Sequence, residues 1–155
     1  MSETPDRLPV SGRLAGIDFG TVRIGVSLSD PSQRFASPLE TFNRSSPARE
    51  SQWILAHVRE HDIQGFVVGL PVHTNGRESQ KSTEARQFAH WLRVTTQRPV
   101  QLFDERFTTV EADSILADAR TPRKKRKQRR DMLAAQILLT AFLESSRETD
   151  SRSLD

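Results

Sequence analysis

The order of hydrophobic and polar residues predicts a chain that alternates between strands and helices. Short apolar runs bounded by turn residues are typical of strands, and the continuous run GFVVGL indicates a fully buried one. A short turn, Gly20-Thr21-Val22, separates the first two runs, which predicts a hairpin. The strands are expected at residues 14–19, 23–29, 35–42 (interrupted by Pro38), 65–70 and 99–104.

Helical spacing of apolar residues marks four other segments. Pro47 suits the first turn of a helix, and Thr108 with Glu111 matches a capping box that would begin another. The last segment, MLAAQILLTAFL, is apolar nearly all round, so this helix is expected to pack deep against the sheet. The predicted helices cover residues 47–60, 79–93, 108–119 and 130–144.

These elements indicate an α/β fold built on one mixed sheet. An antiparallel hairpin with a third strand comes first, strand–helix units follow, and helices are expected on both faces of the sheet. The 155 residues suit one domain, predicted over 14–144. The polar segments 1–13 and 145–155 are expected to form a flexible arm and a flexible tail.

Composition excludes several classes of site. The chain has no cysteine, which excludes disulfides and thiolate metal sites, and no apolar run approaches the ~18 residues of a membrane helix. The first residues lack the apolar core of a secretory signal, so a cytoplasmic protein is the expectation. The net charge of +3 is modest, but the run RKKRKQRR at 123–130 holds seven bases in eight residues and indicates a local anion-binding patch.

Asp18 is an acid near the end of an otherwise apolar strand. Alternation places it on one face with Gly16, and a plausible hairpin register puts Gly25 and Ser27 beside it. Small neighbours would let a ligand approach the backbone there. The alternative is a strand-end acid that accepts hydrogen bonds from nearby backbone N–H groups.

Two later acids could join Asp18. Glu105 follows the strand predicted at 99–104, at the carboxyl edge where open α/β sheets place their sites. The alternative is that Glu105 is a solvated acid in the loop between strand and helix. Asp131 opens the last helix, where an acid also interacts favourably with the helix dipole. Three carboxylates in a chain without cysteine suggest a hard divalent cation, Mg²⁺ or Mn²⁺. Their convergence depends on the fold.

Histidine offers one other metal-binding pattern. His57 and His61 are four residues apart at the end of the first predicted helix and could ligate one ion from the same face. We identify no third ligand from the sequence and interpret the pair as part of an exposed helical face.

Four blocks of sequence together resemble one family. They read GIDFGTVRIGVSLSD, VVGLPVHTNGRES, FDERFTTVEAD and DMLAAQILLTAFLE, and they occur in family order over most of residues 15–144. The chain resembles the YqgF family, also called RuvX, of pre-16S ribosomal RNA nucleases, which are similar to RuvC-type Holliday junction resolvases. The resemblance implies a ribonuclease H-like fold and hydrolase chemistry.

The family's acids carry over by motif to Asp18, Glu105 and Asp131. The resemblance implies that these residues are catalytic and hold one or two Mg²⁺ or Mn²⁺ ions while water attacks a phosphodiester, leaving a 3′-hydroxyl and a 5′-phosphate. The implied substrate is the 5′ end of pre-16S rRNA. The dense basic run before Asp131 departs from the family, because many relatives have only a lysine or two there.

The remaining site candidates are basic. Arg23 and Arg106 lie close in sequence to the acids and could contact backbone phosphates. The run 123–130 is expected to form a mobile loop over the substrate, because packed like charges resist ordering without a polyanion. Its candidate substrate-binding residues are Lys124, Lys125, Arg126, Lys127, Arg129 and Arg130.

Other functions stay open at the level of sequence. A DNA junction resolvase on the same scaffold would usually need a dimer, and neither a monomer nor a dimer follows from the sequence. The tetrapeptide DFGT also resembles the phosphate loop of actin-like phosphotransferases, which need two such domains. A non-catalytic nucleic-acid-binding module is the third alternative. RNA is the expected partner, structured DNA the second, and no membrane is expected.

Overall fold

The computed structural model of the chain describes residues 7–71, 80–105 and 123–153, with only the backbone described for 123–128 and 146–153. Strands and helices alternate along these residues much as predicted. The elements are β1 (Arg13–Phe19), β2 (Arg23–Ser29), β3 (Ala36–Asn43), α1 (Pro47–His61), β4 (Ile63–Leu70), α2 (Gln80–Thr96), β5 (Val100–Asp104) and α4 (Arg123–Ser153).

The strands form one mixed sheet in the order β3-β2-β1-β4-β5. The β1–β2 and β2–β3 pairs are antiparallel, whereas β1–β4 and β4–β5 are parallel, which confirms the predicted sheet. Pro38 lies in β3, an edge strand, beside a register shift between Val26 and Ser27 of β2. Proline is tolerated at this position because an edge strand at a bulge does not need every backbone donor.

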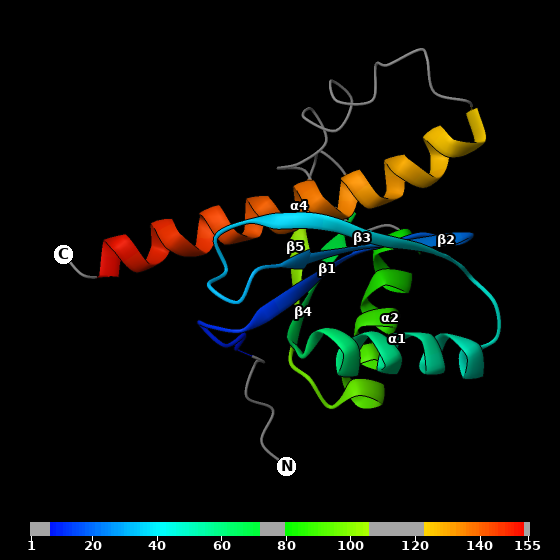
Figure 1. Ribbon diagram of the computed structural model, residues 1–155, viewed down its shortest axis with the longest axis horizontal. Coiled ribbons are helices and arrows are strands. Elements are labelled where there is room, and N and C mark those ends of the chain that lie inside the picture. The colour runs from blue at the N-terminus through cyan, green and yellow to red at the C-terminus, as the bar shows by residue number, and fades with distance from the viewer. Residues whose placement is uncertain (1–6, 72–79, 106–122, 154–155) are drawn as a thin grey trace.

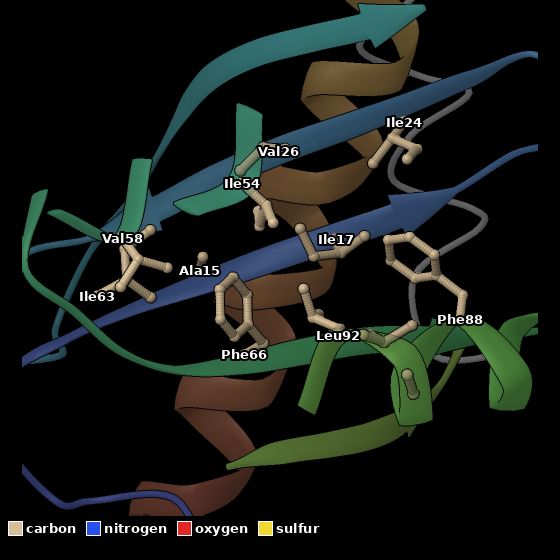
Figure 2. Packing of buried hydrophobic residues seen from close by; sticks show 12 residues of the cluster. Ala15, Ile17, Ile24, Val26, Ile54, Val58, Ile63, Phe66, Phe88 and Leu92 are labelled. Atoms are coloured by element: carbon tan, nitrogen blue, oxygen red, sulfur yellow. The ribbon is translucent and has the colours of Figure 1, made fainter. Parts of the chain in front are cut away.

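Helices cover both faces of the sheet, as expected. Helix α4 lies across one face, and α1 with α2 lies on the other (Figure 1). On the α1–α2 face, Ile17 and Phe66 of the sheet pack with Ile54 and Leu92 of the helices (Figure 2). A second buried cluster lies under α4. Its members are Leu14, Val67, Leu138, Leu139, Phe142 and Leu143.

Helix α1 begins and ends at the residues that local chemistry favours. Ser46 is the N-cap, and its side chain accepts a hydrogen bond from the backbone N–H of Arg49 at 3.3 Å. Pro47 follows in the first turn, where its missing N–H has no helical partner to lose. Asp62 ends the helix in the left-handed conformation (φ 52°), and β4 starts directly afterwards at Ile63.

Helix α4 is longer than predicted, and this corrects the expectation of a mobile basic loop. It begins at Arg123 rather than Arg130, so the basic run forms its first turns, and it continues to Ser153 rather than ending at Glu144. Lysine, arginine and glutamine are good helix formers, and adding turns to an existing helix carries no nucleation cost. The helix predicted at 108–119 lies outside the described residues.

Part of the predicted N-terminal arm is bonded to the turn between β2 and β3. The backbone N–H of Gly12 donates to Pro31 O at 2.8 Å. The Gln33 side chain donates to Pro9 O and Gly12 O at 2.9 and 3.0 Å.

In the ranges that the structure describes, no helix combines the length and the apolar character needed to cross a bilayer.

Candidate active site

Asp18 lies one residue before the end of β1, on the face of the sheet that α4 covers. In the observed register Asp18 is opposite Gly25 and Gly16 is opposite Ser27, which confirms the predicted hairpin pairing. Strand alternation turns the neighbouring Ile17 to the other face, where it is buried among α1 and α2 residues. The strand therefore puts a carboxylate at the carboxyl edge of the sheet without breaking its core.

The small residues beside Asp18 admit a helix, and this corrects the prediction that they leave space for a ligand. A Cβ atom on Gly25 would lie 2.5 Å from the backbone carbonyl carbon of Asp131, a contact too short for real side chains. On Gly16, a Cβ atom would lie 2.9 Å from Ala135 O. Ser27 Oγ donates to that same carbonyl oxygen at 2.7 Å. Glycine and serine thus let α4 approach β1 and β2 closely enough to bring Asp131 to the site.

Glu105 directly follows β5, and a glycine of β4 makes room for its side chain. A Cβ atom on Gly69 would lie 3.0 Å from the carboxyl carbon of Glu105 and nearer still to one of its oxygens. The β1, β4 and β5 strands are parallel, so their carboxyl ends meet at one edge of the sheet. This topology brings Glu105 to Asp18, although 86 positions of sequence separate the two residues and their strands are not neighbours.

The carboxyl groups of Asp18 and Glu105 are hydrogen-bonded to each other. Burial raises the pKa of Asp18 well above its ordinary value, and the negative charges of Glu105 and Asp131 raise it further, while Arg130 opposes them. Burial also raises the pKa of Glu105, whereas the bond from Asp18 and the charge of Lys81 oppose that rise. For both carboxyl groups burial is the largest cause of the raised pKa, and the nearby cations Arg130 and Lys81 act against it.

Asp131 is paired with an arginine. Arg23 Nε lies 2.7 Å from Asp131 Oδ2, and the two side chains are 28% and 21% exposed. In the described residues, the three carboxylates are not gathered within 4.8 Å of one another, so Asp131 reaches Asp18 through its charge rather than by contact. Arg23, predicted to bind substrate, thus contacts an acid of the site.

A cavity of about 250 Å³ opens beside Asp18 and Glu105 at this edge of the sheet. Pro71, which directly follows β4, lines it. Lys81 and Glu84 of α2 also line it, and sequence reasoning missed both. Both residues lie on the polar side of α2, and the amphipathic pattern of this helix was the feature of the sequence that could have indicated them.

A second cavity, of about 340 Å³, continues from the first and shares Phe19, Thr21 and Glu84 with it. Aromatic rings line it: the Phe19 and Phe88 rings stack with centroids 4.7 Å apart, and Trp91 is also present. The Arg44 guanidinium lies 4.7 Å from the Phe19 ring centroid.

The other predicted substrate-binding residues are only partly described. Arg129 and Arg130 are exposed at the start of α4, and the charge of Arg130 reaches Asp18. Arg106 and the side chains of Lys124, Lys125, Arg126 and Lys127 lie outside the described part of the chain.

Three kinds of similarity bear on this geometry. A family model described as RuvX, Holliday junction resolvase, matches residues 12–145. A Rhodopirellula baltica protein named "Putative pre-16S rRNA nuclease" is 51% identical over 142 residues, covering 92% of this chain and 82% of the relative. A Koribacter versatilis protein of the same name is 39% identical over 135 residues, covering 87% and 88%.

Two solved structures that share the fold are those of junction resolvases. T. thermophilus RuvC in complex with a Holliday junction substrate aligns with a TM-score of 0.53 and 19% identity, covering 89% of this chain and 97% of RuvC. The fowlpox virus resolvase, also with Holliday junction DNA, aligns with a TM-score of 0.53 and 8% identity, covering 86% and 97%. At these identities the likeness establishes the RuvC-like ribonuclease H fold alone. The family match and the 51% identical relative go further: this chain belongs to the RuvX family.

Proposed function

We propose that the protein is a metal-dependent nuclease that hydrolyses phosphodiester bonds in RNA, in the 5′-end maturation of pre-16S rRNA. The observation that carries this proposal is the hydrogen-bonded Asp18–Glu105 pair, which lines a cavity at the carboxyl edge of the sheet and feels the charge of Asp131. The names of the relatives supply the substrate class.

The donor set of the site fits a hard cation. Asp18, Glu105 and Asp131 offer only carboxylate oxygens, which suit Mg²⁺ or Mn²⁺ rather than a softer metal. Burial and the negative charges of Glu105 and Asp131 raise the pKa of Asp18, so a positive ion bound there would relieve this repulsion. When bound, such an ion supplies Lewis acidity toward the phosphate group and toward the attacking water.

Basic side chains of the protein lie around the three carboxylates. Lys81 on the cavity wall and Arg130 at the start of α4 are placed to attract and orient a phosphate group. Arg23 holds the Asp131 carboxylate in one orientation through the 2.7 Å pair. The adjoining aromatic cavity offers ring faces and the Arg44 guanidinium to an unpaired base next to the cleaved bond. These features favour a substrate with a single-stranded segment.

A DNA junction resolvase is the second candidate function. The description of the matching family model favours it, and so does the likeness to resolvases solved with junction DNA. Such an enzyme cuts two strands symmetrically, which would require two copies of the site in one assembly.

A cleavage assay with matched variants tests both candidates. Purified protein is incubated with Mn²⁺ or Mg²⁺ and either end-labelled pre-16S leader RNA or a labelled four-way DNA junction. We expect RNA cleavage that requires the ion and falls more than about 100-fold in Asp18→Asn, because removing even supporting groups of a metal site costs 10–100-fold.

The control compares two carboxylates of the same helix. Asp131→Asn should lose activity, whereas Glu144→Gln, which changes an exposed acid of α4, should retain it. An Asp18→Asn protein that is folded by circular dichroism and cleaves RNA at the wild-type rate would contradict the proposal. Paired nicks in the junction without RNA cleavage would support the resolvase instead.

A further inference from the structure

A second cluster of metal-ligating side chains lies on α1. His57, Glu60 and His61 each offer one ligand atom, and these atoms lie within 4.8 Å of one another. The spacing i, i+3, i+4 puts all three on one side of the helix. Their helix ends at His61, two residues before β4 begins at Ile63, and Ile63 pairs with Arg13 at the start of β1. The cluster is therefore near the edge of the sheet opposite to Asp18.

Glu40 determines which ring nitrogen of His57 carries the proton. His57 Nε2 lies 2.6 Å from Oε2 of Glu40 on the edge strand β3, and Trp53 Nε1 donates to the same oxygen at 3.3 Å. An ionised carboxylate only accepts hydrogen bonds, so Nε2 must be the donor. In the neutral imidazole, Nδ1 then keeps its lone pair and is available as a ligand.

The other nitrogen of His57 has no hydrogen-bond partner. Nδ1 is buried and lacks a donor or acceptor among the described residues, although the His57 side chain as a whole is 12% exposed. Buried polar atoms without a partner are rare in native structures, and a bound ion is one of their recognised explanations. A metal ion bound at Nδ1 would give this lone pair a partner and would draw on the two potential ligands that the same helix face offers.

We propose that His57 Nδ1, Glu60 and His61 bind a divalent transition metal of the zinc class, with water completing the coordination. Two imidazoles and one carboxylate are typical zinc donors and poor magnesium donors. Glu40 behind His57 matches the carboxylate–histidine–metal arrangement in which a second residue orients the ligand. Glu60 is the third ligand that we did not identify from the sequence.

Side-chain rotation is sufficient to form this site. His61 Nε2 lies 4.0 Å from Glu60 Oε2, and the His57 and His61 rings are nearly parallel, with centroids 5.6 Å apart. Zinc bonds of about 2.0–2.1 Å place tetrahedral ligands about 3.3 Å apart, so the side chains need to close by roughly an ångström. The helix backbone can stay in place, and the ion would brace the last turns of α1.

Zinc titration of the tag-free full chain tests the proposal. Calorimetry is expected to give one Zn²⁺ per chain, with the affinity lowered at least about 100-fold in His61→Ala and about tenfold in Glu60→Gln. Zinc at 100 times the wild-type Kd should raise the Tm of the wild type by about 5 °C or more, and that of His61→Ala by no more than about 2 °C. His90→Ala, which changes an exposed histidine of α2, is the matched control and should bind like the wild type.

Two results would overturn the proposal. One is the absence of stoichiometric zinc binding in the wild-type chain. The other is zinc binding that His61→Ala leaves unchanged, and its loss in Asp18→Asn would then locate the ion at the acidic cluster. We avoid substitution of His57 in this test because its contact with Glu40 also joins α1 to β3.

Discussion

Gly25 is a point of close approach between β2 and α4, and a methyl group there should displace the helix. In Gly25→Ala the new Cβ atom would lie 2.5 Å from the Asp131 carbonyl carbon. An ordinary contact begins at 3.4 Å, so the helix would have to move by about an ångström. The β2 backbone fixes the position of the Cβ atom, and the atoms that it meets first belong to the α4 backbone. No side-chain rotation can therefore relieve this contact.

The structure sets the size of the expected effect. Overpacking of this kind costs about 1–3 kcal/mol of unfolding free energy, partly offset by the gain of about 0.4–1 kcal/mol that alanine brings over glycine in the unfolded state. The same movement shifts Asp131 and its 2.7 Å pair with Arg23. Since an ångström of misplacement in an active site can cost about 100-fold in rate, activity should fall more than stability.

Gly65→Ala in β4 is the matched control. Its Cβ atom would meet the terminal methyl groups of Leu8 and Leu14 at 2.8 and 3.3 Å, and these can rotate away. Urea unfolding and the RNA cleavage assay are run on both variants. We expect Gly65→Ala to stay within about 1 kcal/mol of the wild type and to keep its activity. A Gly25→Ala protein with wild-type stability and rate would refute the claim that close packing of α4 positions Asp131.

Two further predictions concern stability. Ser27→Ala removes the buried 2.7 Å hydrogen bond to Ala135 O and should lower the unfolding free energy by about 1 kcal/mol in urea, and a variant as stable as the wild type would show that this bond does not anchor α4. Asp30 accepts hydrogen bonds from the Ser32 hydroxyl and from the backbone N–H groups of Phe35 and Arg34. These bonds lower its pKa from 3.8 to about 2. The stability that this carboxylate contributes is therefore complete above pH 4 and is lost as the pH falls toward 2. Asp30→Asn should cost about 1 kcal/mol at pH 7, after allowance for solvent screening, and a cost that stays constant down to pH 2 would contradict this assignment.

Local sequence was sufficient to predict the sheet and the helices that pack on it. The alternation of apolar residues in β1 and β2 predicted their hairpin and placed Gly25 and Ser27 beside Asp18, because strand periodicity depends only on neighbouring residues. Pro47 likewise marked the start of α1. The same reasoning was wrong for the basic run, where charge repulsion predicted a loop and helix propagation from the apolar part of α4 prevailed.

Contacts between distant residues account for what the sequence could not predict. Glycines beside Asp18 suggested open space, and only packing showed that α4 fills it, through contacts that join residues 108 positions apart. Lys81 entered the site because α2 follows β4 at the carboxyl edge of the sheet.

The sequence by itself determined the elements, the acids and the family resemblance. Tertiary structure decided which carboxylates meet, that Asp131 is paired with Arg23, and that His57 has a buried nitrogen without a hydrogen-bond partner among the described residues. The physical reason is that periodicity and propensity act over a few residues, whereas a site depends on how separate elements pack against one sheet.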